Sequence, residues 1–132
     1  MLHHTGFVVT DLAKARRFYE AIGKILGLGT KDIPNQQAFL LGRSAAEPIP
    51  YLWIGTERPS FWVEGSRAGI NQMHVAFVAP DRKTVDEFYR VGLTAGGRDN
   101  GKPGLRDFAP NYYAAFLLDP DGNNIEAVTH AT

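Results

Sequence analysis

The sequence predicts an α+β fold built from two tandem βαβββ modules. Six identical residues recur at a fixed offset of 70 between the segments 4–19 and 74–89. In both segments an alternating, strand-like stretch is followed by apolar residues at helical spacing, and three more strand-like stretches follow each helix. Because stacked-repeat folds generally need about three units or more, two copies favour one domain with two similar halves. The recurring residues are His4/His74, Phe7/Phe77, Val8/Val78, Asp11/Asp81, Phe18/Phe88 and Tyr19/Tyr89.

The first strand of each half offers a histidine. Residues 2–9 are apolar or β-branched in alternation, which is typical of a strand. Successive strand side chains point to opposite faces, so His4 shares a face with the small residue Gly6, and His74 shares one with Ala76. We interpret the bulkier opposite face as covered by a helix and the histidine face as lining a hollow.

A helix follows the first strand in each half. Asp11 suits its N-cap, and Gly27 and Gly29 close it and open the next element. Glu20 and Lys24 form a favourable i,i+4 pair on its polar side. The apolar positions have helical spacing: Leu12, Ala15, Phe18, Ile22, Ile25 and Leu26. The second helix begins at Pro80-Asp81, ends at Gly96-Gly97, and carries Val85, Phe88 and Tyr89 inward.

Short strands complete each half. The expected strands are 28–33, 37–41 and 50–54 in the first half, and 99–107, 112–118 and 124–128 in the second. The stretch 38–41 resembles 115–118 at an offset of 77, which implies about seven extra residues in the second copy. Part of this insert, Gly101 to Arg106, is expected to form a loop near the hollow. We therefore expect one domain, 1–132, with module 1 (1–55), a connector (56–70) and module 2 (71–130).

Composition excludes several classes of protein. The chain has 132 residues, 14 basic and 14 acidic side chains and no cysteine. A domain of this length can bury a substantial core. The balanced charge disfavours nucleic acid and anionic membrane partners, and the absence of cysteine excludes disulfides and thiolate sites. No stretch approaches the roughly 18 apolar residues of a membrane span, and residues 1–4 lack a cationic leader, so we expect a soluble cytoplasmic protein.

The duplicated module, its paired histidines and the ending D-P-D-G-N-N-I-E at 119–126 resemble the vicinal oxygen chelate superfamily. That group includes glyoxalase I, bleomycin resistance proteins, extradiol dioxygenases and methylmalonyl-CoA epimerase. The resemblance covers nearly the whole chain and implies that the eight strands curl into a cup-like mixed sheet with helices on its outer face. It also implies a homodimer, because modules of this type commonly pair edge to edge or exchange halves.

The resemblance implies a metal site. His4, His74 and Glu126 map onto the ligands of one divalent ion, which is Zn, Ni, Mn or Fe(II). Two imidazoles and a carboxylate leave about three positions open for water and substrate. The last strand of module 1, 51–54, contains no carboxylate, so the fourth ligand of glyoxalase I is missing. The alternative role of Glu126 is a carboxylate that faces water at the end of a tight hairpin.

Other side chains are candidates for substrate contact or proton transfer. Tyr112 and Tyr113 occupy opposite-facing positions, so at most one of them lines the cup. Tyr113 is the candidate for moving a proton. Tyr112, Arg106 and Trp53 are the candidates for binding substrate, and the connector pair Phe61-Trp62 joins 101–106 as an expected source of selectivity. Residues with weaker claims are His3, expected at or near the surface, His130, expected in a frayed tail, and Glu47 and Glu57, possible stand-in ligands.

Three functions follow from these candidates. The first is a metal-dependent lyase, isomerase or dioxygenase that acts on a small substrate with adjacent oxygens by stabilising an enolate or enediolate. The second is a metal-free protein that sequesters a small molecule in the cup, as bleomycin resistance proteins do. The third is a partner-binding module that has kept the fold and lost the site. The paired histidines favour the first.

Overall fold

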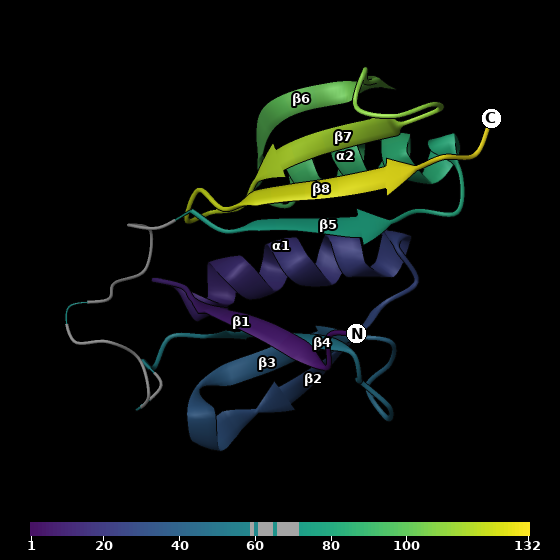
Figure 1. Cartoon of the computed structure of the whole chain (residues 1–132). Helices are drawn as coiled ribbons and strands as arrows, with labels where there is room; N and C mark the ends of the chain where they lie inside the picture. The colour runs from purple at the N-terminus through teal and green to yellow at the C-terminus, as the bar shows by residue number, and fades with distance from the viewer. Residues whose placement is uncertain (59, 61–64, 66–71) are drawn as a thin grey trace.

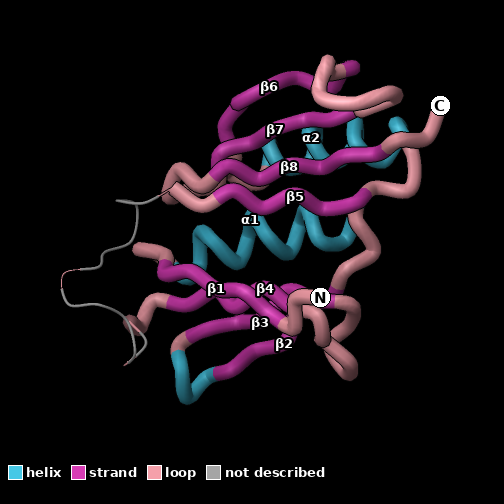
Figure 2. The backbone as a smooth tube through the Cα atoms, viewed as in Figure 1, coloured by secondary structure: helices cyan, strands magenta, loops and turns pink. Residues whose placement is uncertain are grey.

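The structure is a computed structural model that describes residues 1–58, 60, 65 and 72–132 (Figure 1). The pair Phe61-Trp62 lies outside the described residues. Figure 2 shows the helices and strands along the chain. Module 1 contains β1 (His4–Val8), α1 (Leu12–Ile25), β2 (Gly29–Ile33), the short 3₁₀ helix η1 (Pro34–Gln36), β3 (Ala38–Gly42) and β4 (Tyr51–Gly55). Module 2 contains β5 (His74–Val78), α2 (Arg82–Thr94), β6 (Arg98–Leu105), β7 (Tyr113–Leu118) and β8 (Asn124–Thr129).

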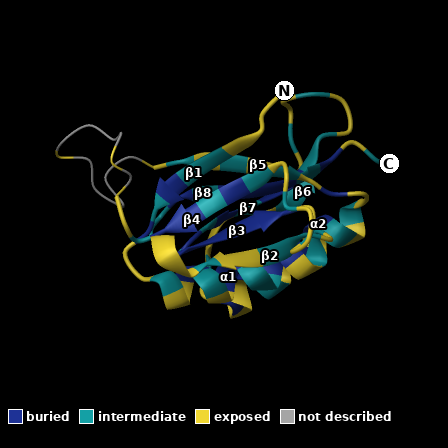
Figure 3. Ribbon diagram, turned by 90° about the horizontal axis from the view of Figure 1, so that it is seen from below, coloured by how far each residue is buried: buried dark blue, intermediate teal, exposed yellow. Residues whose placement is uncertain are grey.

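The two modules have the same topology. Each forms an open four-stranded sheet, in the order β1-β4-β3-β2 in module 1 and β5-β8-β7-β6 in module 2. The first strand runs parallel to the last, and the other neighbours are antiparallel. Both helices lie on the same side of the sheets, so the opposite sheet faces are left without helices (Figure 3). The predicted fold of two βαβββ modules is confirmed.

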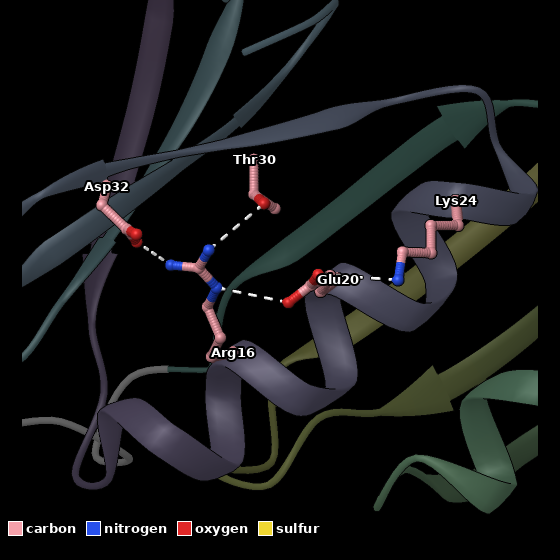
Figure 4. A network of polar contacts seen from close by, with 5 residues as sticks. All are labelled: Arg16, Glu20, Lys24, Thr30 and Asp32. Atoms are coloured by element: carbon pink, nitrogen blue, oxygen red, sulfur yellow. Dashed lines mark hydrogen bonds and ion pairs between the residues drawn. The ribbon is translucent and has the colours of Figure 1, made fainter.

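Local signals set the helix boundaries. Asp11 accepts a hydrogen bond from the backbone N–H of Lys14 at 3.0 Å, and Asp81 accepts one from Thr84 at 2.7 Å. Each carboxylate therefore satisfies a backbone donor that the first helical turn leaves unpaired. The polar side of α1 carries the predicted pair of Lys24 with Glu20, 3.6 Å apart. Figure 4 shows this pair beside the contacts of Arg16 with Glu20, Thr30 and Asp32.

One core lies between the sheets and the helices and continues from one module into the other. In β1 the exposed fraction of Phe7 is 4%, whereas on β5 the opposite-facing Val78 is 84% exposed. The helices α1 and α2 also pack against each other. A Cβ atom at Gly92 of α2 would lie 3.2 Å from Ile22 of α1, so the small residue permits this close approach. The predicted helix-covered face is confirmed, whereas the hollow expected on the histidine face stays a prediction.

A buried carboxylate fastens the modules together. Asp119 lies in the turn between β7 and β8 and is completely buried. It accepts a hydrogen bond from the hydroxyl of Tyr19 on α1 at 2.6 Å, and bonds from the backbone N–H groups of Asp121 and Asn123. Burial and the neighbouring carboxylate raise the pKa of Tyr19 well above its ordinary value, so this hydroxyl keeps its proton. The D-P-D-G turn is therefore both a hairpin and a contact between modules.

Two expectations about the second module are wrong. The segment 101–104 continues the strand β6, with register shifts against β7, and does not form a separate loop. The offset between the third strands is 76, because Leu40 pairs with Trp53 in the way that Phe116 pairs with Glu126. The offset of 77, taken from sequence similarity, had matched residues whose side chains point to opposite faces of the two sheets. The insertion is thus one residue shorter than the sequence pattern implied.

Candidate functional site

The candidate site lies on the uncovered face of the module 2 sheet. In the register of this sheet Ala76 of β5 pairs with Glu126 of β8, and Glu126 pairs with Phe116 of β7. Paired residues share a face, so Glu126 points to the same side as His74, which is two residues from Ala76. The parity predicted from the sequence therefore places the histidine and the carboxylate together.

His74 and Glu126 form a close pair. His74 Nε2 lies 3.2 Å from Glu126 Oε2. The Glu126 residue is 2% exposed, whereas the side chain of His74 is 53% exposed. A buried carboxylate needs hydrogen-bond donors or a cation to offset its desolvation. The histidine supplies one such contact and keeps an edge open to solvent.

Tyr112 contacts the other oxygen of the same carboxylate. Its hydroxyl donates a hydrogen bond to Glu126 Oε1 at 2.5 Å. This bond, followed by burial and the negative charge of Glu126, raises the pKa of Tyr112 to about 12. The phenol therefore stays protonated across the neutral range, beside a carboxylate that accepts its hydrogen bond.

Asn124 holds the far side of the His74 ring. His74 Nδ1 lies 3.0 Å from Asn124 Nδ2 and 3.2 Å from the backbone oxygen of the same residue. Asn100 Nδ2 in turn donates to Asn124 Oδ1 at 3.1 Å. A continuous line of polar groups therefore runs from β6 through β8 and β5 to Tyr112.

His4 lies on the other sheet with different neighbours. Its ring stacks on Tyr51, with centroids 4.9 Å apart and planes 9° from parallel, and its Nδ1 lies 2.9 Å from Nδ1 of His3. In the part of the chain that the structure describes, no group of three or more His, Asp or Glu side chains is arranged to hold a metal ion. The donor chemistry of His74 and Glu126 fits a divalent ion, but one chain brings only these two of the three predicted ligands together.

The two tyrosines separate as the alternation of the strand requires. Tyr112 faces Glu126, whereas Tyr113 pairs with Thr129 on the face that α2 covers. There its hydroxyl donates to Asp86 Oδ1 at 2.8 Å, and this bond raises the pKa of Tyr113. The structure thus places Tyr112, predicted to bind substrate, beside Glu126, and places the predicted proton carrier Tyr113 away from it.

Trp53 and Arg106 lie on the uncovered faces with other partners. Trp53 pairs with Gly6 in β1 in the same register that Glu126 has with Ala76, so it occupies the position equivalent to Glu126. Its Nε1 donates to Gln36 Oε1 at 2.9 Å. The Arg106 guanidinium lies 5.5 Å from the Phe116 ring and donates to the backbone oxygen of Ala114 at 3.3 Å. Arg106 therefore stabilises the pairing of β6 with β7, and it also lies beside the site.

Sequence reasoning missed three neighbours of this site. Asn124 has the same parity as Glu126, so the alternation in β8 was a signal that could have found it. Phe108 and His130 each lie edge-on to Tyr112, with ring centroids 5.3 Å away. His130 Nδ1 also lies 3.1 Å from the backbone oxygen of Pro110, so it is not a residue of a frayed tail. No local pattern pointed to these two contacts.

Two βαβββ modules, each an open four-stranded sheet with its first strand parallel to its last, define the class of fold to which this chain belongs. The chain belongs to the Glyoxalase/Bleomycin resistance protein/Dioxygenase superfamily, whose family model matches residues 1–127. The resemblance predicted from the sequence is therefore confirmed. No helix among the described residues is long and apolar enough to cross a membrane.

Solved structures show the same fold. A glyoxalase/bleomycin resistance protein from Albidiferax ferrireducens T118 is 28% identical, with a TM-score of 0.69 and 97% of each chain covered. A lactoylglutathione lyase from Agrobacterium tumefaciens is 20% identical, with a TM-score of 0.65, and the match covers 97% of this chain and 92% of that one. TioX from Micromonospora sp. ML1 is 14% identical, with a TM-score of 0.68 and 99% of each chain covered. No protein of curated function matches the sequence significantly.

Proposed function

We propose that the protein is a divalent-metal-dependent enzyme that acts on a small substrate with adjacent oxygen atoms, as a lyase, isomerase or dioxygenase. The observation that carries the proposal is the pair of His74 and Glu126 on the uncovered sheet face, 3.2 Å apart. A carboxylate that is 2% exposed beside a half-exposed imidazole offers two ligands with one open side. Both ligand types suit Zn, Ni, Mn and Fe(II).

The residues around this pair prepare it for proton transfer. Tyr112 holds Oε1 of Glu126 by a hydrogen bond, which fixes the carboxylate and leaves Oε2 for His74. The phenol keeps its proton at neutral pH because the hydrogen bond to Glu126 raises its pKa, so it is a hydrogen-bond donor in the site. A divalent ion bound here would polarise a substrate oxygen and stabilise negative charge on it. Tyr112 replaces Tyr113 in the proposed acid–base role, since only Tyr112 reaches the carboxylate.

The proposed site is completed across a homodimer. His4 is the third predicted ligand, and within one chain it stacks on Tyr51 in the other sheet. Apolar side chains are exposed on and beside the uncovered face of module 2, where Val78 is 84% exposed and Phe108, which contacts Tyr112, is 70% exposed. A second copy that covers these faces would bury apolar surface and bring its own His4 to His74 and Glu126. Light scattering is expected to give the mass of two chains, and the mass of one chain would contradict the dimer.

Metal content tests the proposal directly. Protein purified without chelator is expected to contain close to one divalent ion per chain by elemental analysis. His74→Ala and Glu126→Ala are expected to lose the ion because each removes a ligand. Glu87→Ala, which removes a carboxylate that pairs with Arg90 on α2, is the control, and it is expected to retain the ion. Wild-type protein without metal, or a His74→Ala variant that keeps it, would contradict metal dependence.

The second candidate function is metal-free binding of a small molecule, as in bleomycin resistance proteins. It is favoured by the aromatic side chains Trp53, Tyr112 and Phe116 on the uncovered faces, and because the described residues contain no group of three ligands arranged around one point. Calorimetry with a panel of flat aromatic and cationic compounds separates the two candidates. Chelator-treated protein that binds such a compound as tightly as untreated protein would support the second function.

A further inference from the structure

We propose that Asn124 is a positioning residue that decides which nitrogen of the His74 ring carries the proton. The inference rests on the proposed function, in which His74 holds a cation through Nε2. Asn124 is suited to this role because it presents two opposite groups to one ring atom. Its side-chain Nδ2 lies 3.0 Å from His74 Nδ1, and its backbone oxygen lies 3.2 Å from the same atom.

The orientation of the Asn124 amide is set by β6. Asn100 Nδ2 donates to Asn124 Oδ1 at 3.1 Å, so the Oδ1 atom of Asn124 is already used as an acceptor. The Nδ2 group of Asn124 is therefore the one that faces the ring. An amide N–H donates and cannot accept, so it favours a bare lone pair on His74 Nδ1.

The opposite nitrogen faces a different group. His74 Nε2 lies 3.2 Å from Oε2 of Glu126, whose other oxygen already accepts from Tyr112. A bare Nε2 would set a lone pair against a buried carboxylate, whereas a protonated Nε2 donates a hydrogen bond to it. The Asn124 side chain and Glu126 thus favour the same tautomer, whereas the backbone oxygen of Asn124, 3.2 Å from Nδ1, favours the other. Because two of these three contacts agree, we expect the cation-free ring to carry its proton on Nε2.

A cation held by His74 Nε2 would reverse this arrangement. A metal is held by the lone pair of a neutral imidazole, so Nε2 would have to give up its proton before it could ligate. The ring would stay neutral if that proton left Nε2 for water and another were taken up on Nδ1. The backbone oxygen of Asn124 can then accept from Nδ1–H. The side-chain Nδ2–H would oppose Nδ1–H as donor against donor, so the Asn124 amide works against the metal-binding tautomer.

A graded series of variants follows from this opposition. Asn124→Leu removes the donor and keeps the backbone acceptor, so the Nδ1–H tautomer is expected to gain population. Asn124→Asp replaces the donor with a carboxylate acceptor and is expected to favour Nδ1–H most strongly. Asn100→Ala frees the Asn124 amide to turn and is expected to act in the same direction with a smaller effect.

Nitrogen NMR of the full-length, metal-free protein tests the inference. Long-range ¹H–¹⁵N spectra near pH 8, more than a unit above the ordinary histidine pKa of about 6.5, distinguish protonated from bare ring nitrogens. The His74→Gln variant identifies the His74 signals. Wild type is expected to show a protonated Nε2 and a bare Nδ1, and Asn124→Asp the reverse. Asn35→Asp, the same change at an exposed site in module 1, is expected to leave the His74 spectrum unchanged.

Three spectra would overturn the inference: a wild-type proton on Nδ1, a ring protonated on both nitrogens, or an Asn124→Asp ring identical to wild type.

Zn²⁺ affinity, measured by competition with a chromophoric chelator, is expected to rise about 10–100-fold in Asn124→Asp. Zn²⁺ that binds no variant, with the tautomers as expected, would refute the metal function and leave the positioning role standing. Normal Zn²⁺ binding by variants whose His74 tautomer is the same as in wild type would refute the positioning role and leave the metal function standing.

Discussion

The two modules share a backbone plan and differ in the polar groups they place on it. At equivalent positions in the sheets, module 1 has Trp53 and module 2 has Glu126. His4 stacks on an aromatic ring in module 1, whereas His74 pairs with a carboxylate in module 2. The helix-covered faces are alike because both must bury apolar side chains. The uncovered faces do not have to bury a core, so their side chains, and the chemical function that depends on them, can differ between the modules.

The turns between the last two strands differ in the same way. Module 2 uses the D-P-D-G turn, whose Asp119 is buried against Tyr19 of module 1. Module 1 uses the longer segment 43–50, in which Ser44 Oγ accepts a bond from the backbone N–H of Glu47 at 2.9 Å. Module 2 therefore supplies both the candidate site and a buried contact that joins the modules. The stability of the whole chain should depend more on this turn than on its counterpart.

Replacing Asp119 tests this difference most severely. Asp119→Ala removes an acceptor of four hydrogen bonds and leaves the buried Tyr19 hydroxyl without a partner. The free energy of unfolding is expected to fall by about 4 kcal/mol. Ser44→Ala in module 1 is expected to cost less than about 1 kcal/mol. Urea unfolding measures both, and similar losses for the two variants would show that the turns are equivalent.

The ionisation of Tyr112 tests a second difference between the modules, the carboxylate of Glu126 that module 1 lacks at the equivalent position. Glu126→Gln weakens the hydrogen bond and removes the negative charge by which Glu126 raises the pKa of Tyr112 to about 12, so the pKa is expected to fall toward 10, by less than about two pH units because the burial of the phenol remains. Ultraviolet absorbance of the phenolate measures it, and Tyr112→Phe identifies the signal. The folded-state pKa lies above the unfolded value, so the associated stability is present below pH 10 and is lost between pH 10 and about 12. A Tyr112 pKa that stays near 12 in Glu126→Gln would exclude the carboxylate as its cause.

Much of this comparison could be predicted from the sequence. Alternation in the first strands placed His4 and His74 on the uncovered faces, because side-chain parity needs no tertiary information. The resemblance supplied Glu126. Parity also showed that Tyr112 and Tyr113 face opposite ways. It could not show which of them meets Glu126, because the pairing of Tyr113 with Thr129 is set by the register between β7 and β8.

Other features depend on contacts between distant segments. The stretch 101–104 contains Gly and Pro, which locally favour a loop, yet pairing with β7 keeps it in a strand. Gly101 has a φ of +152°, a conformation that other residues rarely adopt, so the glycine belongs to the irregularity of this strand. The separation of His4 from His74 likewise depends on how the modules pack, and no local pattern encodes that packing.

Giving module 1 the missing carboxylate would narrow the difference between the modules. Trp53→Glu places a carboxylate at the position equivalent to Glu126, on the face that carries His4. If two copies complete one site, this change supplies the fourth ligand, and Zn²⁺ affinity is expected to rise at least about tenfold. Trp53→Leu is the control, because it removes the indole without adding a ligand. Equal Zn²⁺ affinity in the two variants would place residue 53 outside the site.

The helix ends provide the smallest expected effect, because here the modules are most alike. Gly27 follows α1 with a φ of +72° and Gly96 follows α2 with a φ of +105°, and a Cβ atom at either position would meet nothing within 4 Å. Substitution by Ala therefore adds backbone strain without a clash. Gly27→Ala is expected to lower the free energy of unfolding by about 1 kcal/mol. Gly96→Ala should cost somewhat more, because +105° lies further from the left-handed minimum near +57°. Urea unfolding of both variants checks the order, and a larger loss at Gly27 would mean that contacts rather than φ decide these positions.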